Sequence, residues 1–341
     1  MDLNILWFLL IGGMFTAYAV LDGFDLGVGI LHLFTRTDAE RRAMITSIGP
    51  VWDGNEVWLV TGVGALFGAF PDAYSTLFSG FYTVYMLILV GLIFRGVAIE
   101  FRNLEASGRW RRSWDFLFAV GSIVPTLMFG IMVGNLIVGI PIGPDKEVIA
   151  ENFFALLRPY PILVGIFVLS LFTLHGALWL NFKMTGELQT RVKGWAKRCF
   201  WIFLAMYIVT SGATIYLYPH MIANFGHFWW AWILVVLTVL AVLNVPRTLH
   251  LGYELRALLN VACIIAGTFT LFGIGVFPNL IRSSLDAAYS LNLHNAASSS
   301  STLGIMLIMA IVGIPFIMSY TVGIYWVFRG KVVVDKEDHK H

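Results

Sequence analysis

Long apolar segments separated by short polar stretches fill the sequence up to residue 328. A helix that crosses a bilayer core of about 30 Å needs about 20 apolar residues, and nine segments have adequate length. They run from Leu3 to Leu33, Val51 to Phe70, Leu77 to Ile99, Phe116 to Ile140, Pro159 to Phe182, Cys199 to Tyr218, Phe228 to Val245, Glu254 to Phe277 and Thr302 to Phe328. The pattern predicts an all-α, polytopic membrane protein of about nine transmembrane helices, forming one domain over residues 1–341.

The positions of Lys and Arg predict the orientation, because cytoplasmic loops collect basic residues. With the N-terminus outside, only Lys146, Arg158 and Arg282 of the 22 basic residues fall on the outer side. We therefore expect a multi-pass protein of a bacterial or archaeal cytoplasmic membrane, with a frayed cytoplasmic tail from Arg329 to His341. The first apolar segment lacks the flanks of a cleaved signal peptide, so it is expected to remain as a helix.

Two segments of the chain resemble each other weakly. The first reads LIGGMFTAYAVLDGFDLG, and the second, LVGIFVLSLFTLHGALWL, begins at Leu163. Both run from outside to inside in the predicted topology. The chain is therefore compatible with two four-helix repeats, residues 1–140 and 155–278, followed by a last helix over residues 302–328.

Composition excludes several classes of protein. Hydrophobic residues make up 58% of the chain and charged residues 12%, whereas soluble domains carry about 25% charged residues. A net charge of +2 is too balanced for a nucleic-acid-binding surface. Cys199 and Cys263 stand alone, so neither a disulfide framework nor a thiolate metal site is indicated. No phosphate-binding loop, nucleophile elbow or HExxH motif is present.

Acidic residues within apolar segments are the first candidates for chemistry. Asp22 and Asp25, three residues apart in LDGFDLGVG, lie on one face of the first helix. Carboxylates at membrane depth usually face a partner, a cavity or a proton path, although a buried cap or a bond between helices would also explain them. Gly23 and Gly27 form a GxxxG spacing that allows another helix to approach closely.

A second polar group opens the next predicted helix, in GPVWDGNEVWL. Asp53, Asn55 and Glu56 follow its start and suit a proton inlet, while Trp52 and Trp58 suit a subunit interface. The simpler interpretation is that the acids complement the helix dipole and the tryptophans anchor the helix at the membrane surface. Pairing of Arg95, in the third helix, with an acid of the first two helices remains open.

The histidines are the candidates for haem iron ligands, which normally come from packed helices. Only His175 is expected well inside the membrane; the others lie near helix ends, in a loop or in the tail, at positions 32, 220, 227, 250, 294, 339 and 341. One intramembrane histidine is more often hydrogen-bonded than a ligand. We therefore expect no haem or metal ligand from this chain.

Several motifs resemble subunit II of cytochrome bd quinol oxidases. They are LDGFDLGVG, TRTDAERRAMITSIGPVWDGNEVWL, FSGFY, FRGVAIEFR and RWRRSWD. The resemblance to the family appears again in VFPNLIRSS. The resemblance implies a haem-free partner of subunit I, which carries two b-type haems and one d-type haem, takes electrons from membrane quinol and reduces dioxygen to water. It also implies a small single-helix subunit and contact with membrane lipids.

The same resemblance implies roles for individual residues. Asp25 and Asp53 would belong to a proton route from the cytoplasm to the haem site, with Asp22, Glu56 and Asn55 as secondary members. Trp58 would border an oxygen route. Two other functions remain compatible with the sequence: a cation-coupled secondary transporter, supported by the intramembrane acids and the repeat, and a membrane scaffold without a proton path.

Overall fold

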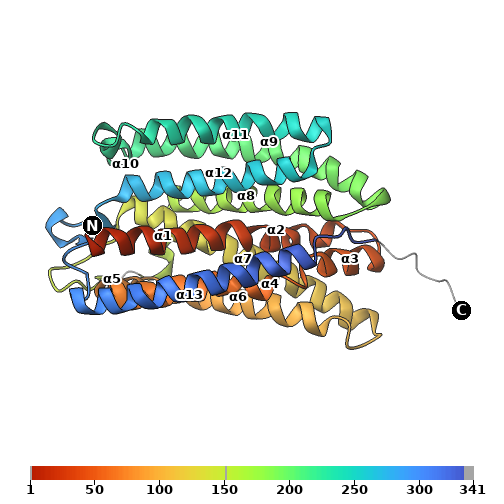
Figure 1. Cartoon of the computed structure of the whole chain (residues 1–341), viewed down its shortest axis with the longest axis horizontal. Helices are drawn as coiled ribbons and strands as arrows, with labels where there is room; N and C mark the ends of the chain where they lie inside the picture. Colours follow the sequence, from red (N-terminus) through yellow and green to blue (C-terminus); the bar gives the residue numbers. More distant parts are fainter. Residues whose placement is uncertain (1, 150–151, 334–341) are drawn as a thin grey trace, which may run out of the picture.

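The computed structural model describes residues 2–149 and 152–333, and its long helices run side by side along one axis (Figure 1). The elements are α1 (Leu3–Leu21), α2 (Gly23–Leu31), η1 (His32–Phe34), α3 (Asp38–Ile48), α4 (Trp52–Ala69), α5 (Pro71–Gly80), α6 (Tyr82–Phe101), α7 (Gly108–Val138), η2 (Phe153–Leu156), α8 (Pro159–Lys183), α9 (Gly186–Leu217), α10 (His220–Ala223), η3 (Asn224–Gly226), α11 (Ala231–Leu251), α12 (Glu254–Val276), β1 (Asn279–Ile281), η4 (Ala287–Tyr289), β2 (Leu291–Asn292) and α13 (Ser300–Val327). The predicted all-α membrane fold is confirmed.

Eight membrane-spanning candidates occur in the part of the chain that the structure describes, against nine predicted segments. The difference is α4, which forms where residues 51–70 were expected to span but has only 18 residues. Its first two turns contain Asp53, Asn55 and Glu56, and these side chains lower its hydropathy. The ninth helix is therefore present, but it is short and polar at its start.

The first membrane span is divided by a one-residue turn at Asp22, between α1 and α2. The backbone bonds continue across it: the Asp22 amide donates to Tyr18, and the Leu26 amide donates to the Asp22 carbonyl. The turn keeps the two segments in one span, from Leu3 to Phe34.

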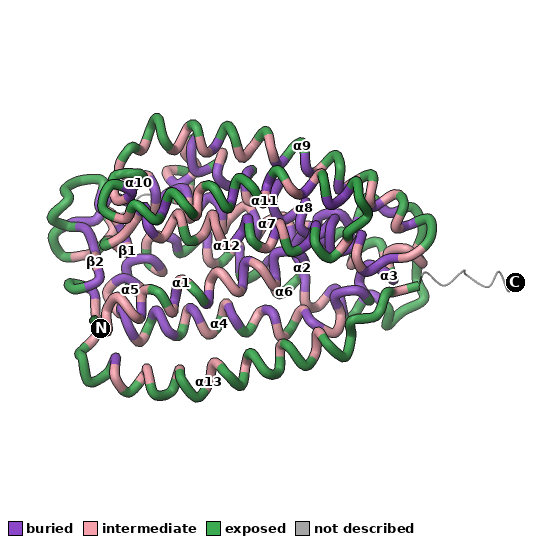
Figure 2. The backbone as a smooth tube through the Cα atoms, turned by 45° about the horizontal axis from the view of Figure 1, so that its top comes forward, coloured by how far each residue is buried: buried purple, intermediate pink, exposed green. Residues whose placement is uncertain are grey.

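The centre of the bundle is formed by α2, α7 and α8, whereas α13 lies at the periphery and is exposed along most of its length (Figure 2). α2 approaches α8 closely because Gly27 and Gly176 face each other. A Cβ added to Gly27 would lie 1.9 Å from the Phe172 carbonyl oxygen, and one added to Gly176 would lie 2.3 Å from the Gly27 carbonyl carbon. The close approach predicted from Gly23 and Gly27 is confirmed.

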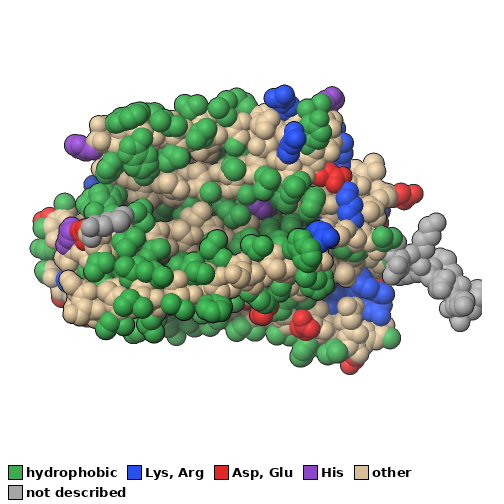
Figure 3. Space-filling model, in the orientation of Figure 1, with side chains coloured by type: hydrophobic (Ala, Val, Ile, Leu, Met, Phe, Trp, Pro, Cys, Tyr) green, Lys and Arg blue, Asp and Glu red, His purple; other side chains and the backbone are tan. Residues whose placement is uncertain are grey.

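The two ends of the bundle differ in charge. Lys and Arg gather at the end that holds α3 (Figures 1 and 3), while the N-terminus and the β1–β2 hairpin lie at the other end (Figure 2). α3 begins with a capping box. The Thr37 hydroxyl oxygen accepts from the Glu40 backbone amide, and the Glu40 carboxylate accepts from the Thr37 backbone amide. This distribution agrees with the predicted basic cytoplasmic side.

The prediction of a frayed tail is wrong for its first residues. The Val332 amide donates to the Lys183 carbonyl at 2.7 Å, and the Lys331 ammonium pairs with Glu254 at 2.7 Å. These contacts hold the segment after α13 against the ends of α8 and α12. Residues 334–341 of the predicted tail lie outside the described residues.

Candidate functional site

A buried ionic cluster joins α1, α4 and α6 inside the bundle. The Arg95 guanidinium, fully buried on α6, donates to Asp22 Oδ1 at 2.7 Å and to Glu56 Oε1. Asp22 is also fully buried, and the side chain of Glu56 is one quarter exposed. The pairing of Arg95, which the sequence left open, is thus present and involves two carboxylates at once.

Asp25 lies one helical turn from this cluster and is held by an amide. Asn55 Nδ2 donates to Asp25 Oδ2 at 2.7 Å and to the Leu21 carbonyl at 3.0 Å. The Tyr325 hydroxyl, on α13, donates to Asn55 Oδ1 at 3.0 Å. Asn55 therefore connects α2 with α13, helices that are about 300 residues apart in the sequence.

Several polar atoms of this region have no hydrogen-bond partner among the described residues: Asp22 Oδ2, Asp25 Oδ1 and Arg95 Nε and Nη1. Buried polar atoms are nearly always hydrogen-bonded, to protein or to water. The neighbourhood contains three carboxyl groups, Asp22, Asp25 and Glu56, and one guanidinium. An excess of carboxyl groups in a membrane interior is the composition of a site that can take up and release a proton.

The other predicted site residues occupy different environments. Asp53 is exposed on α4 and does not join the buried cluster. Trp58 is 8% exposed, with no hydrogen-bond partner for its indole Nε1 in the described chain. Trp52 is partly buried and lies against Gly96 of α6. The structure therefore brings Asp22, Asp25, Asn55 and Glu56 together and leaves Asp53 on the surface.

A second ionic network lies at the basic end of the bundle and centres on Asp115. His32 Nε2 and Arg102 Nε each lie 2.6 Å from Asp115 Oδ1, and Arg41 donates to Oδ2 at 3.0 Å. Arg102 continues the network to Asp38 at 2.5 Å. These bonds fasten α3 to α6 and α7.

Asp38 stays ionised in this network for an electrostatic reason. Burial alone would raise the pKa of the Asp38 carboxyl, but the hydrogen bond and positive charge of Arg102 outweigh burial, with help from Arg42 and Arg111. The pKa of Asp38 therefore lies below its ordinary value. Its contribution to stability is present above that ordinary value and is lost as the pH falls through the lowered pKa.

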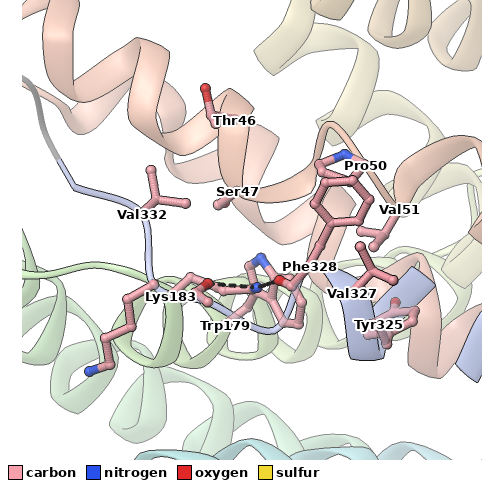
Figure 4. Close-up of a pocket in the computed structure, with 12 residues that line it drawn as sticks. Thr46, Ser47, Pro50, Val51, Trp179, Lys183, Tyr325, Val327, Phe328 and Val332 are labelled. Carbon is pink, nitrogen blue, oxygen red and sulfur yellow. Dashed lines mark hydrogen bonds between the residues drawn. The ribbon is translucent and has the colours of Figure 1, made fainter. Parts of the chain in front are cut away.

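A cavity of about 330 Å³ opens at the same end of the bundle (Figure 4). Its walls are the end of α3 and the start of α4, the end of α8, and the end of α13 with the segment that follows it. Tyr325, the residue that donates to Asn55, lines this cavity. No sequence signal distinguished Tyr325, because an aromatic residue near a helix end is typical of a membrane interface.

An all-helical bundle with apolar spans and buried ion pairs defines an integral membrane protein with a polar centre. The model of the cytochrome bd terminal oxidase subunit II family matches residues 3–328, and the chain belongs to this family. It is similar to cytochrome bd-I ubiquinol oxidase subunit 2 of Escherichia coli K12, with 36% identity over 98% of this chain and 96% of the relative. It is also similar to cytochrome bd ubiquinol oxidase subunit 2 of Bacillus subtilis 168, with 33% identity over 97% of both chains.

Among solved structures, the fold is similar to a chain of the bd oxidase from Geobacillus thermodenitrificans. The TM-score is 0.81 at 15% identity, over 96% of this chain and 99% of that chain. The protein is therefore a subunit of a quinol oxidase and a multi-pass protein of the bacterial cytoplasmic membrane. The family predicted from LDGFDLGVG and the accompanying motifs is confirmed, and the oxidase is selected over the transporter.

Proposed function

We propose that this chain is the haem-free subunit II of a bd-type oxidase that reduces dioxygen to water with electrons from quinol, and that it carries part of the proton route to the haem site. The observation that carries the proposal is a cluster with more carboxyl groups than cations: Asp22 and Glu56 both pair with the buried Arg95 guanidinium, and the buried Asp25 lies one helical turn away. Water formation at a buried haem consumes protons, and intramembrane carboxyl groups are suitable relay groups.

The position of Asp25 suits an entry from the cytoplasm. It lies nine residues before Phe34, the end of the first span, a helical distance of about 13 Å. Asp22 follows one turn deeper and bonds to Arg95. A proton that reaches Asp25 can continue towards the interior along this face of the helix.

The partner is subunit I, as the names of the relatives, each a subunit 2, imply. We place its contact on the face formed by α4 and α13. Asp53 is exposed there, near the start of α4, and an exposed carboxylate is unfavourable against lipid and acceptable against a protein surface. Trp52 and Trp58 belong to the same helix and are proposed to support this interface and an oxygen route. A small single-helix subunit and membrane lipids would cover other apolar faces.

The haems, two of b type and one of d type, are assigned to subunit I. His32, a buried histidine of this chain, is bonded to Asp115. His175 stacks on Phe24 with ring centroids 5.6 Å apart, and among the described residues no group of three metal-ligating side chains is found. These environments favour structural roles for both histidines.

The variant Asp25→Asn, in the complete oxidase, tests the proton route. Asparagine has nearly the size of aspartate, and its amide oxygen can still accept the bond from Asn55. It cannot take up and release a proton as a carboxyl group does. We expect oxygen consumption at saturating quinol to fall, with haem content and assembly retained. Glu105→Gln, which neutralises an exposed carboxylate in the loop after α6, is the control and should leave turnover unchanged. Normal turnover in Asp25→Asn would remove Asp25 from the route.

Asp53→Asn separates a relay role from an assembly role. A fall in turnover with full haem content supports Asp53 as a member of the route. Loss of haem from the purified membrane fraction instead assigns Asp53 to the contact with subunit I.

A further inference from the structure

The cavity at the basic end is connected to the Asp25 site through Tyr325, which lines the cavity and bonds to Asn55. It is large enough for several water molecules, each of which occupies about 30 Å³ in the liquid. Figure 4 shows Ser47 pointing from α3 towards the segment after α13, and Tyr325 on the opposite side of the opening. Cytoplasmic water can enter a cavity in this position, because α3 belongs to the basic side of the protein.

Tyr325 forms the connection from the cavity to Asp25. It lines the cavity, and its ring packs edge to face against the stacked rings of Phe24 and Trp179, with centroid distances of 6.4 and 6.1 Å. Its hydroxyl donates to Asn55 Oδ1, and the Asn55 amide nitrogen donates to Asp25 Oδ2. The amide of Asn55 is thereby fixed, and Asp25 Oδ1 is left without a partner among the described residues.

The segment Phe328–Val332, which we name the C-terminal strap, closes one side of the cavity. Lys183 donates to the carbonyl oxygens of Phe328 and Gly330 (Figure 4), the second at 3.1 Å. The Val332 amide is bonded to the Lys183 carbonyl in return. The wall opposite α3 is therefore held in place by one lysine at the end of α8.

We propose that this cavity is the cytoplasmic mouth of the proton route and that Tyr325 is a positioning residue, which orients Asn55 so that Asp25 presents Oδ1 to an incoming proton. The inference rests on the proposed function of Asp25. The Asn55 amide is not itself a relay; it holds the carboxyl group, while the proton arrives from water in the cavity. Tyr325 thus acts on proton delivery through Asn55.

The charged groups around this mouth come from several elements. Lys183 on α8 and Lys331 after α13 line the cavity itself, whereas Asp25 on α2, Glu56 on α4 and Arg95 on α6 belong to the polar cluster behind Tyr325. Lys183 and Lys331 are already engaged, with the strap carbonyls and with Glu254. Glu254, bonded to Lys331, lies at the start of α12, whereas Asp25 is the fully buried carboxyl group that hydrogen bonds connect to the cavity through Tyr325 and Asn55.

The first test is Tyr325→Phe in the purified oxidase, compared with Tyr253→Phe, an exposed tyrosine outside the cavity. Loss of the hydroxyl frees the Asn55 amide to rotate. We expect maximal turnover to fall about three- to tenfold, the rate equivalent of one neutral hydrogen bond, with quinol KM and haem content unchanged. The deficit should grow at alkaline pH, where protons are scarce. Turnover equal to that of Tyr253→Phe at every pH would overturn the proposal.

The second test blocks the cavity and leaves the bonds of Tyr325, Asn55 and Asp25 unchanged; because the Ser47 hydroxyl donates to the Met44 carbonyl, unmodified Ser47→Cys is the reference. Ser47→Cys is placed in a Cys199→Ser, Cys263→Ser background and treated with a cationic methanethiosulfonate in inside-out vesicles. Thr190→Cys, on the exposed start of α9, is the labelled control. We expect modification of Ser47→Cys alone to lower turnover, with the haem spectrum retained. Full turnover after complete modification would contradict the proposal that this cavity is the mouth of the proton route.

The two proposals fail in different ways. If Asp25→Asn slows turnover while Tyr325→Phe and the blocked cavity do not, the proton route stands and its mouth lies elsewhere. If Asp25→Asn has no effect, the route through Asp25 itself is wrong.

Discussion

Arg95 pairs with Asp22 and Glu56 at the same time, in an interior where each unpaired charge is unfavourable. Its side chain is fully buried, as is that of Asp22. A buried ion pair contributes little net stability relative to apolar residues, but removal of one partner is strongly destabilising because the other charge remains. Arg95 is therefore expected to determine whether the core around Asp22 forms at all.

Arg95→Gln should destabilise the subunit by about 3–5 kcal/mol. The reason is that Asp22 and Glu56 would face each other without a compensating charge. Haem content of the purified membrane fraction and thermal unfolding in detergent measure the effect. Arg109→Gln, at an exposed position after α6, is the matched control, and equal stability of the two variants would contradict this role of Arg95.

The contact between α2 and α8 is the feature of the helices on which the site depends most. Gly27 and Gly176 allow the two backbones to meet, and this contact places α2, with Asp25, in the centre of the bundle. Packing in membranes relies on such small residues, because lipid competes equally well for apolar side chains. The close backbone spacing here keeps the helix that carries Asp25 against α8.

Gly27→Ala should separate the two helices, because the added methyl group would overlap the Phe172 carbonyl oxygen. Overpacking of this kind destabilises by about 1–3 kcal/mol. A lowered midpoint of thermal unfolding and reduced turnover are expected. Gly212→Ala, on α9, meets no atom within 4 Å and should leave both values unchanged; a wild-type midpoint for Gly27→Ala would show that the helices can shift freely.

The whole molecule is polarised, with the basic residues at the end that holds α3 and the β1–β2 hairpin at the other. The cavity, the C-terminal strap and the Asp115 network all belong to the basic end. This arrangement orients the proposed proton mouth towards the cytoplasm, because loops rich in Lys and Arg stay on the cytoplasmic side of the membrane.

Thiol labelling of intact cells can check this orientation. In a background without Cys199 and Cys263, Ala288→Cys in the exposed hairpin loop should react with an impermeant maleimide added outside. Thr190→Cys should react only after the membrane is opened. The reverse pattern would place the cavity outside and exclude it as a cytoplasmic mouth. The two predicted repeats, residues 1–140 and 155–278, stay a prediction at this scale.

The sequence alone determined the class of fold, predicted the orientation and marked the acidic residues of the candidate site. Helix length, hydropathy and loop charge are local properties, and the membrane translates them directly into spans and sidedness. The acids were recognisable because charge is rare in apolar segments. The ordered motifs around Asp25 and Asp53 also predicted the oxidase family.

Only the tertiary structure decided which of these residues meet. Arg95 joins Asp22 and Glu56, and Tyr325 reaches Asn55 across 270 residues, while Asp53 stays on the surface. Such contacts depend on how helices rotate and approach one another, which glycine contacts and side-chain packing determine jointly. Periodicity along one helix specifies its apolar positions, but it does not specify the neighbour that each polar side chain will face.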